Sequence, residues 1–336
     1  MAHRDIIAIG GSAGSGAALR KVMASLPPDL PASLFIATHV PSQSSGYLAD
    51  MLDRCGPLPV GEALDGQPIE KSRAYVAVPD RHLLLVDGII RLGDGPRENM
   101  SRPAIDPLFR SAALAYGGRA VGVLLSGLLN DGASGLFAIK ACGGTAIVQH
   151  PLDAEASQMP LAALETVSPD AVTAAEDLAE LLVRTATSKA GKTLPPPEHL
   201  ALEVEIAAGA RLGSHALHAF ADPSVLTCPN CQGVLSEVRS EQPLRFRCQT
   251  GHAVTAEVLA ARTEEVDEAV RIALRVMEER VSLVTRMAED ARTTGRDAVA
   301  ELYEARAREY GHYATVLREA AVETLHMRRP ARDQDG

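Results

Sequence analysis

A serine, a histidine and an aspartate each follow a short apolar run in the first half of this sequence. The residues, with the runs that precede them, are Ser12 after 6–9, His39 after 34–37 and Asp131 after 121–125. These residue types can serve as a nucleophile, a general base and a group that orients the base. If the runs are parallel strands, their carboxyl ends share one edge of a sheet, where α/β proteins carry their chemistry. The pattern therefore predicts covalent catalysis at that edge.

Each of the three residues also has an ordinary structural use. Ser12 and Asp131 could cap helices, and His39 could be a hydrogen-bonded residue with no catalytic role. The glycine-rich turn over 10–16 could bind a phosphate. However, its letters, GGSAGSG, lack the usual spacing of a dinucleotide loop, and the second run ends in His39 rather than in an acidic residue. Spacing alone does not show that the three side chains meet.

A second set of residues has the spacing of metal ligands. Cys228 and Cys231 form a C-x₂-C pair, Cys248 and His252 form a C-x₃-H pair, and sixteen residues separate the two pairs. This arrangement predicts a tetrahedral Cys₃His site for structural zinc. Four protein ligands leave no open position on the metal, so no cofactor is expected to act in catalysis. The alternatives are scattered buried residues or a redox-active cysteine pair.

Apolar runs alternate with helical patterns up to about residue 186, which predicts a doubly wound, mostly parallel sheet of the α/β class. The exception is Asp87-Gly88, a pair between two apolar runs that predicts an antiparallel hairpin. Further along, 234–235 and 244–247 are expected to be strands of a small zinc ribbon. Two apolar stripes at helical spacing then predict a helical hairpin with a break near 293–297.

The chain is therefore expected to have several parts. They are an α/β domain over 1–186, a Pro-rich linker and connecting segment over 187–222, a zinc-ribbon-like module over 223–253, a helical hairpin over 254–327 and a flexible tail over 328–336. The hairpin could be a stabilising appendage, a dimer surface or a docking element for a partner. The sequence does not separate these roles, and it leaves the oligomeric state open.

The composition limits the classes of partner. The chain has 336 residues, a net charge of −10, 46% hydrophobic and 23% charged residues. A surface with this charge does not favour nucleic acid, because phosphate binding requires basic side chains. Since no apolar run approaches the ~20 residues that span a bilayer, membrane insertion is not expected. The start of the chain lacks the apolar segment of a signal peptide, and five cysteines fit a reducing compartment, so a cytoplasmic protein is expected.

Residues 5–186 resemble the catalytic domain of the protein-glutamate methylesterase of bacterial chemotaxis, the CheB-type domain. The motifs that carry the resemblance are Ile9–Gly14, Thr38–Pro41, Val78-Pro79 through His82-Leu83, Arg102-Pro103, Asp106–Ala112, Asn130–Gly132 and Met159-Pro160. The resemblance implies that Ser12, His39 and Asp131 form a catalytic triad and that the loop with Leu128 supplies a main-chain oxyanion donor. It also implies a γ-glutamyl methyl ester on a receptor as substrate, with glutamine deamidation in some members. The implied partners are a methylated signalling protein and a methyltransferase counterpart.

The sequence departs from that family at several positions. Leu128 and Leu129 stand where Met and Gly are usual, and Ala13 and Ser15 replace the commoner Thr and Gly. A Cβ at residue 129 restricts the backbone. The family's receiver domain is missing before the first strand, so gating by aspartyl phosphorylation in cis is not expected. Two other functions compete with a methylesterase: a catalytically silent module that binds a partner, and a serine hydrolase for small esters.

Overall fold

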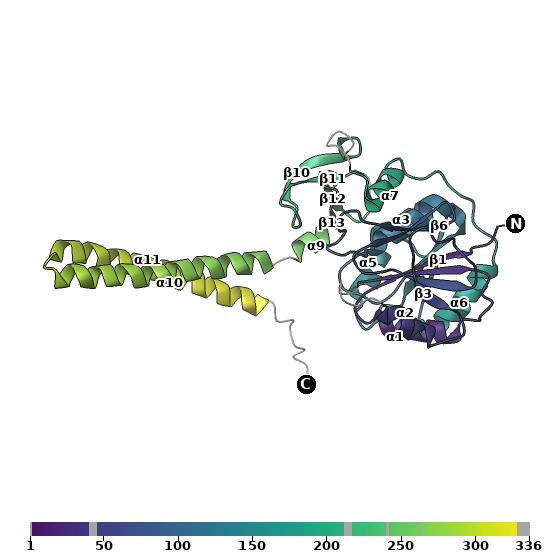
Figure 1. The fold of residues 1–336 in the computed structure, drawn as a ribbon, viewed down its shortest axis with the longest axis horizontal. Helices are drawn as coiled ribbons and strands as arrows, with labels where there is room; N and C mark the ends of the chain where they lie inside the picture. The colour runs from purple at the N-terminus through teal and green to yellow at the C-terminus, as the bar shows by residue number, and fades with distance from the viewer. Residues whose placement is uncertain (1, 40–45, 212–216, 240–241, 262–263, 328–336) are drawn as a thin grey trace. The chain divides into compact units, whose positions relative to one another are not determined.

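The computed structural model describes residues 2–39, 46–211, 217–239, 242–261 and 264–327 (Figure 1). The chain divides into two compact units, Met1–Leu259 and Ala260–Gly336. Val40 and Pro41 of the second motif, and the tail predicted over 328–336, lie outside the described residues. Among the described residues, none of the helices combines the length and the apolar character that crossing a bilayer requires.

The first unit is built on a sheet of seven parallel strands, in the order β3-β4-β2-β1-β7-β8-β9. The strands are β1 (Ile6–Gly11), β2 (Ser33–Thr38), β3 (Val60–Glu62), β4 (Arg73–Val76), β7 (Ala120–Leu124), β8 (Thr145–Gln149) and β9 (Ala171–Thr173). The predicted doubly wound α/β fold is therefore confirmed. The short edge strands β3 and β9 were not predicted from the sequence.

Both faces of the sheet are covered, which explains why its strands are continuous apolar runs. In β1, Ile6 and Ala8 belong to one buried cluster, and Ile7 and Ile9 belong to the cluster on the other face. The helices α1 (Ser15–Ser25), α2 (Tyr47–Asp53) and α6 (Ala175–Thr187) contribute to the second cluster, and α3 (Ile105–Tyr116), α4 (Ala133–Ala141) and α5 (Gln158–Thr166) contribute to the first (Figure 1).

An antiparallel hairpin, β5 (His82–Val86) and β6 (Ile89–Gly93), packs beside helix α3. Its turn residues Asp87 and Gly88 have φ angles of 46° and 83°. Two consecutive positive φ values are typical of the tight turn that Asp-Gly favours. The hairpin predicted from this dipeptide is confirmed.

The rest of the first unit covers the predicted linker and zinc ribbon, and it also includes 254–259, which were predicted as the start of the helical hairpin. Helix α7 (Leu200–Ala208) forms inside the segment predicted as a connection and packs against α3 and β5. Beyond it, four antiparallel strands form a second sheet, β10 (Ala221–Thr227), β11 (Val234–Val238), β12 (Arg245–Cys248) and β13 (Ala253–Thr255), followed by the short helix α9 (Ala256–Ala260). We call β10–β13 and α9 the Cys/His module.

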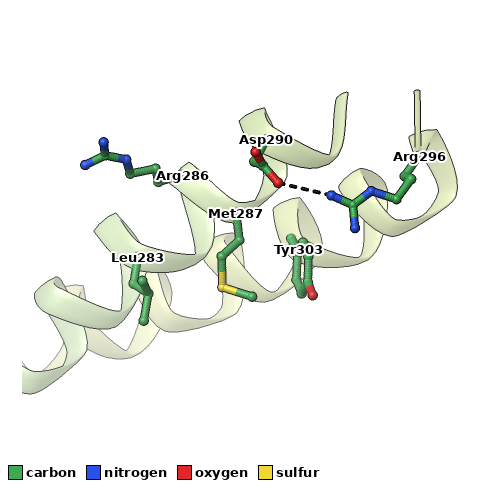
Figure 2. A pocket seen from close by; sticks show the side chains of 6 residues that line it. All are labelled: Leu283, Arg286, Met287, Asp290, Arg296 and Tyr303. Carbon is green, nitrogen blue, oxygen red and sulfur yellow. Dashed lines mark hydrogen bonds and ion pairs between the residues drawn. The ribbon is translucent and has the colours of Figure 1, made fainter. Parts of the chain in front are cut away.

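The second unit is a pair of long helices, α10 (Glu264–Thr293) and α11 (Asp297–Met327), as the predicted hairpin requires. Ion pairs between Arg292 and Glu304 (2.7 Å) and between Arg318 and Glu278 (2.6 Å) join the two helices. A hollow of about 480 Å³ lies near the turn and is lined by residues that include Met287 (Figure 2). Among its lining residues, Asp290 and Arg296 form an ion pair at 3.0 Å (Figure 2).

Candidate active site and metal centre

Ser12, His39 and Asp131 come from three neighbouring strands. Strands β2, β1 and β7 lie side by side at the centre of the sheet, and Gly11 at the end of β1 pairs with Thr38 at the end of β2. Ser12 directly follows Gly11, and His39 directly follows Thr38, so both residues lie at the same edge of the sheet. Asp131 lies in the loop that follows β7. The chain order reverses between β1 and β7, and α/β sheets place their binding sites at such a point.

The structure brings the three side chains into one hydrogen-bonded chain. Ser12 Oγ lies 3.1 Å from His39 Nδ1, and His39 Nε2 lies 2.7 Å from Asp131 Oδ2. The aspartate accepts the Nε2 proton, which leaves Nδ1 unprotonated and able to accept the proton of Ser12. These distances are those expected of a nucleophile, its base and the group that orients the base.

The turn that carries Ser12 is held tightly between strand and helix. Ser12 N–H donates to the carbonyl of Ser126 (2.9 Å), and Ser15 Oγ donates to the carbonyl of Ser12 (2.6 Å). A Cβ at Gly127 would lie 3.0 Å from the Cβ of Ser12 and only 2.6 Å from the Met159 side chain. Glycine at 127 therefore lets the loop after β7 approach the serine.

Asp131 lies at the amino terminus of helix α3. The main-chain N–H groups of Ile105 and Asp106 donate to its two oxygens at 2.7 and 3.3 Å, and Asn99 Nδ2 donates at 2.9 Å. Burial acts to raise the pKa of Asp131, but the hydrogen bond and charge of His39, with these other donors, lower that pKa to about 2. Asp131 is therefore held as a carboxylate, which is the form that can stabilise a protonated imidazole.

A second buried carboxyl group, Asp106, lies beside Asp131. Asn99 Nδ2 donates to Asp106 as well, at 3.0 Å, and Gly135 N–H donates to it at 2.6 Å. Burial and the negative charge of Asp131 raise the pKa of Asp106 to about 7. The amide of Asn99 therefore bridges two carboxyl groups that would otherwise repel each other.

The environment of His39 makes it a stronger base than an ordinary histidine. Burial acts to lower its pKa, but the hydrogen bond to Asp131 and the negative charges of Asp131 and Asp106 outweigh burial and raise that pKa. The ring remains partly accessible, with 24% of its side chain exposed. A base that is both strengthened and reachable fits the role that the sequence predicts for it.

Two main-chain N–H groups, one next to Ser12 in the chain and one in the loop after β7, are candidate donors to a ligand. Within the described part of the chain, neither Leu128 N–H nor Ala13 N–H has an acceptor. By contrast, Leu129 N–H donates to the side chain of Gln158 (3.0 Å). The sequence pointed to the loop of Leu128 but not to Ala13, although the residue after a nucleophilic serine often supplies an oxyanion donor.

A cavity of about 290 Å³ opens in front of the serine and the histidine, between α1 and α2. Its lining includes Ser12, His39, Arg20, Tyr47 and Met51. Tyr47 is 72% exposed, so the cavity is an open cleft rather than an enclosed pocket. An ester on the surface of a large substrate could therefore approach Ser12.

The four predicted metal ligands also meet in space. One ligand atom each from Cys228, Cys231, Cys248 and His252 lies within 4.8 Å of all the others. The Sγ atoms of Cys231 and Cys248 are 3.6 Å apart, and Cys248 Sγ lies 3.5 Å from His252 Nδ1. A tetrahedral zinc ion with its usual bond lengths would set these distances to about 3.8 and about 3.6 Å. The cluster could therefore hold a metal of that size.

Sequence reasoning missed the residues that surround Ser12, His39 and Asp131. Asn99 has a φ of 47° and lies in a turn that no motif announces. It contacts Asp131, 32 positions away, and Thr255, 156 positions away. In the sequence, the one signal for Asp106 is its place in the motif Asp106–Ala112, and Asn99 carries none.

Comparison with known proteins places the first part of the chain in a defined group. A family model described as CheB methylesterase matches residues 7–182, more than half of the chain. Protein-glutamate methylesterase/protein-glutamine glutaminase 2 of Anaeromyxobacter dehalogenans is 38% identical over 181 residues, which are 54% of this chain and 53% of that protein. A protein of Leptospira interrogans is also 38% identical over 181 residues, which are 94% of its length.

A solved structure gives the same result. The catalytic domain of the CheB methylesterase of Thermotoga maritima matches with a TM-score of 0.52 and 31% sequence identity. The match covers 54% of this chain and 97% of that domain. The similarity thus extends over nearly the whole of the Thermotoga domain and over about half of this chain.

Proposed function

The chain belongs to the CheB methylesterase family, and we propose that it hydrolyses γ-glutamyl methyl esters on a methylated signalling protein through Ser12, His39 and Asp131. One observation carries the proposal: the hydrogen-bonded chain from Ser12 Oγ through the His39 ring to the Asp131 carboxylate. The names of the similar proteins support the choice of a glutamyl substrate in a protein.

The chemistry follows from the atoms that meet. Ser12 Oγ attacks the ester carbonyl while its proton moves to His39 Nδ1, and Asp131 stabilises the resulting imidazolium. The tetrahedral intermediate collapses, and methanol leaves with the proton from His39. Water then attacks the acyl-enzyme with His39 as its base, which releases the glutamate carboxylate and restores Ser12.

The negative oxygen of the intermediate requires fixed donors. The free N–H groups of Leu128 and Ala13 are the donors that we propose for this oxyanion. A main-chain donor survives a change of side chain, so the unusual Leu128 and Ala13 are compatible with the role. Loss of one oxyanion donor costs about 10²–10³ in rate in enzymes of this type. The same acyl-enzyme route would deamidate glutamine, with ammonia as the leaving group.

The substrate class can be tested by comparing the turnover of two esters. A methyl-esterified helical fragment of a chemoreceptor and a small activated ester are offered to the protein separately, and release of methanol or of the small alcohol is followed. We expect a much higher kcat/KM for the receptor fragment, because the open cleft before Ser12 suits an ester on a large surface. Equal or better turnover of the small ester would favour a general hydrolase, and no turnover of either would favour a silent binding module.

The base predicts a pH dependence. The folded protein raises the pKa of His39 above the usual histidine value of ~6.5. The histidine therefore loses its proton, and can act as the base, only above that pH. We expect the acid limb of kcat/KM above that pH. Asp131→Asn removes the main negative charge that raises the pKa of His39. Burial lowers that pKa, so it should then place the pKa below the usual range. Histidine resonances in NMR, assigned with His39→Gln, measure both values; an unchanged pKa in Asp131→Asn would contradict the account.

We also propose that the ion held by Cys228, Cys231, Cys248 and His252 is zinc. The donor set and its spacing favour zinc, and four protein ligands leave no position for substrate, so the ion would supply stability rather than catalysis. The purified protein should contain about one equivalent of zinc. Cys231→Ser should lose it, whereas Cys55→Ser, a change at a cysteine outside the cluster, should keep it. Elemental analysis that finds no zinc in the wild type would refute the site.

A further inference from the structure

The Cys/His module pairs directly with a segment that supports the catalytic aspartate. Asn99 N–H donates to the carbonyl of Ala253 in β13 (2.9 Å), and Ala253 N–H donates to the carbonyl of Arg97 (3.4 Å). Thr255 N–H donates to Asn99 Oδ1 at 3.2 Å. Strand β13 therefore binds Asn99 by both its backbone and its side chain.

These contacts fix the orientation of the Asn99 amide. Its Oδ1 faces a donor from the module, and its Nδ2 faces the oxygens of Asp131 and Asp106. A rotated amide would place a carbonyl oxygen against two carboxyl groups and an NH₂ group against an N–H. Both contacts would be repulsive, and Asn99 is buried, so water could not replace the lost partners.

A second contact joins the module to the loop that follows β7 and carries Asp131. Thr255 Oγ1 donates to Asn130 Oδ1 at 2.7 Å, and both residues are buried. In the same loop, Leu129 has a φ of 60°, a conformation that side chains with a Cβ disfavour, and it packs against the apolar core of the module. The packing therefore stabilises Leu129 in a backbone conformation that it would not otherwise prefer.

The metal ligands are continuous with this contact surface. His252 immediately precedes Ala253, the first residue of β13, and Cys248 N–H donates to the carbonyl of His252 (3.0 Å). Arg247, next to Cys248, forms a buried ion pair with Glu98 (3.1 Å), the neighbour of Asn99. A bound ion that fixes Cys248 and His252 thus fixes the strand that holds Asn99.

We propose that the Cys/His module is a positioning element of the active site. Thr255 and Asn99 hold Asp131 and its loop in place. Metal binding at the four ligands therefore increases the rate of ester hydrolysis. The proposal rests on the function proposed above. None of these module residues touches the reacting atoms. Their effect is on the placement of Asp131 and, through it, of the His39 ring, and small displacements of catalytic groups are costly in rate.

The first test changes one hydroxyl group. Thr255→Val keeps the shape of the side chain and removes the bond to Asn130 (2.7 Å), together with the longer bond that Thr255 Oγ1 accepts from Val258 N–H inside the module (3.3 Å). We expect kcat, and the rate at which a fluorophosphonate labels Ser12, to fall about tenfold, as loss of one buried hydrogen bond allows. KM should change less than twofold. Thr255→Ser, which restores a hydroxyl group, should recover most of the rate.

The matched control is Ser224→Ala, which removes a hydroxyl group of the same module. Ser224 Oγ donates only within the module, to the carbonyl of Leu235 (2.8 Å), so the rates should stay at the wild-type level. Equal rates in Thr255→Val and the wild type would overturn the proposal. So would an equal loss in Ser224→Ala, because the effect would then come from general loosening of the module.

The second test removes the metal from the wild type with a chelator. We expect slower labelling of Ser12, reversed by one equivalent of zinc, together with faster hydrogen exchange in peptides over 97–106 and 126–133. Unchanged labelling and unchanged exchange would overturn the role of the metal. If the wild type hydrolyses no glutamyl ester but labelling and exchange respond as stated, the proposed function fails and the positioning role stands.

Discussion

Ser12→Ala and His39→Ala should each lower kcat by about 10⁴-fold or more, and the double variant should lose little beyond the larger single effect. The reason is that Ser12 and His39 act in one step: without the base the hydroxyl is a weak nucleophile, and without the hydroxyl the base has no proton to take. Their atoms lie 3.1 Å apart, as such a unit requires. Methanol release from a methylated receptor fragment measures all three variants.

The control for this series is Ser224→Ala, which removes a hydroxyl group that donates to the carbonyl of Leu235 and not to Ser12 or His39. It should keep most of the activity. If the fold-loss in kcat of the double variant equalled the product of the two single losses, Ser12 and His39 would act independently, and the shared step would be contradicted.

The largest expected effect on stability is at Glu203. Its carboxylate pairs with Arg245 at 2.6 Å and with Arg247 at 2.8 Å, all three residues are buried, and Arg110 lies nearby. Burial acts to raise the pKa of Glu203, but the three arginines hold it well below its usual range. Glu203→Gln would leave buried positive charges with too few partners, so we expect a loss of about 3–5 kcal/mol in the free energy of unfolding.

Glu205→Gln is the matched control for that measurement. Glu205 lies on the same helix α7 but is exposed, so the same chemical change should shift the urea midpoint very little. Equal midpoints for Glu203→Gln, Glu205→Gln and the wild type would show that the buried ion pairs do not join α7 and the Cys/His module as described.

The central sheet and the approach of Ser12 and His39 could be predicted because their signals are local. Strands such as Ile6–Gly11 are buried on both faces and therefore appear as continuous apolar runs. Ser12 and His39 follow their strands directly, so the shared strand edge predicts that they are near each other. The Cys/His cluster could be predicted for the same reason, since Cys228 and Cys231, like Cys248 and His252, are close in sequence.

The union of the Cys/His module with the α/β domain could not be predicted. Glu203 lies in a segment predicted only as a connection, and its pairing with Arg245 and Arg247 shows why a carboxylate is there. The position of the Asn99 side chain requires a positive φ and a contact with strand β13, which lies more than 150 positions later in the chain. Such contacts depend on tertiary packing, and no periodicity or motif in either segment records them.

Covalent labelling during turnover gives the sharpest test that Ser12 is the nucleophile of a protein-glutamate methylesterase. The protein is titrated with a fluorophosphonate, the modified residue is located by mass spectrometry, and methanol release from a methylated receptor fragment is measured on the same samples. We predict one equivalent of label on Ser12, with activity lost in proportion to labelling. Methanol release that continues at full rate with Ser12 fully modified, or inactivation by a label elsewhere, would contradict the account.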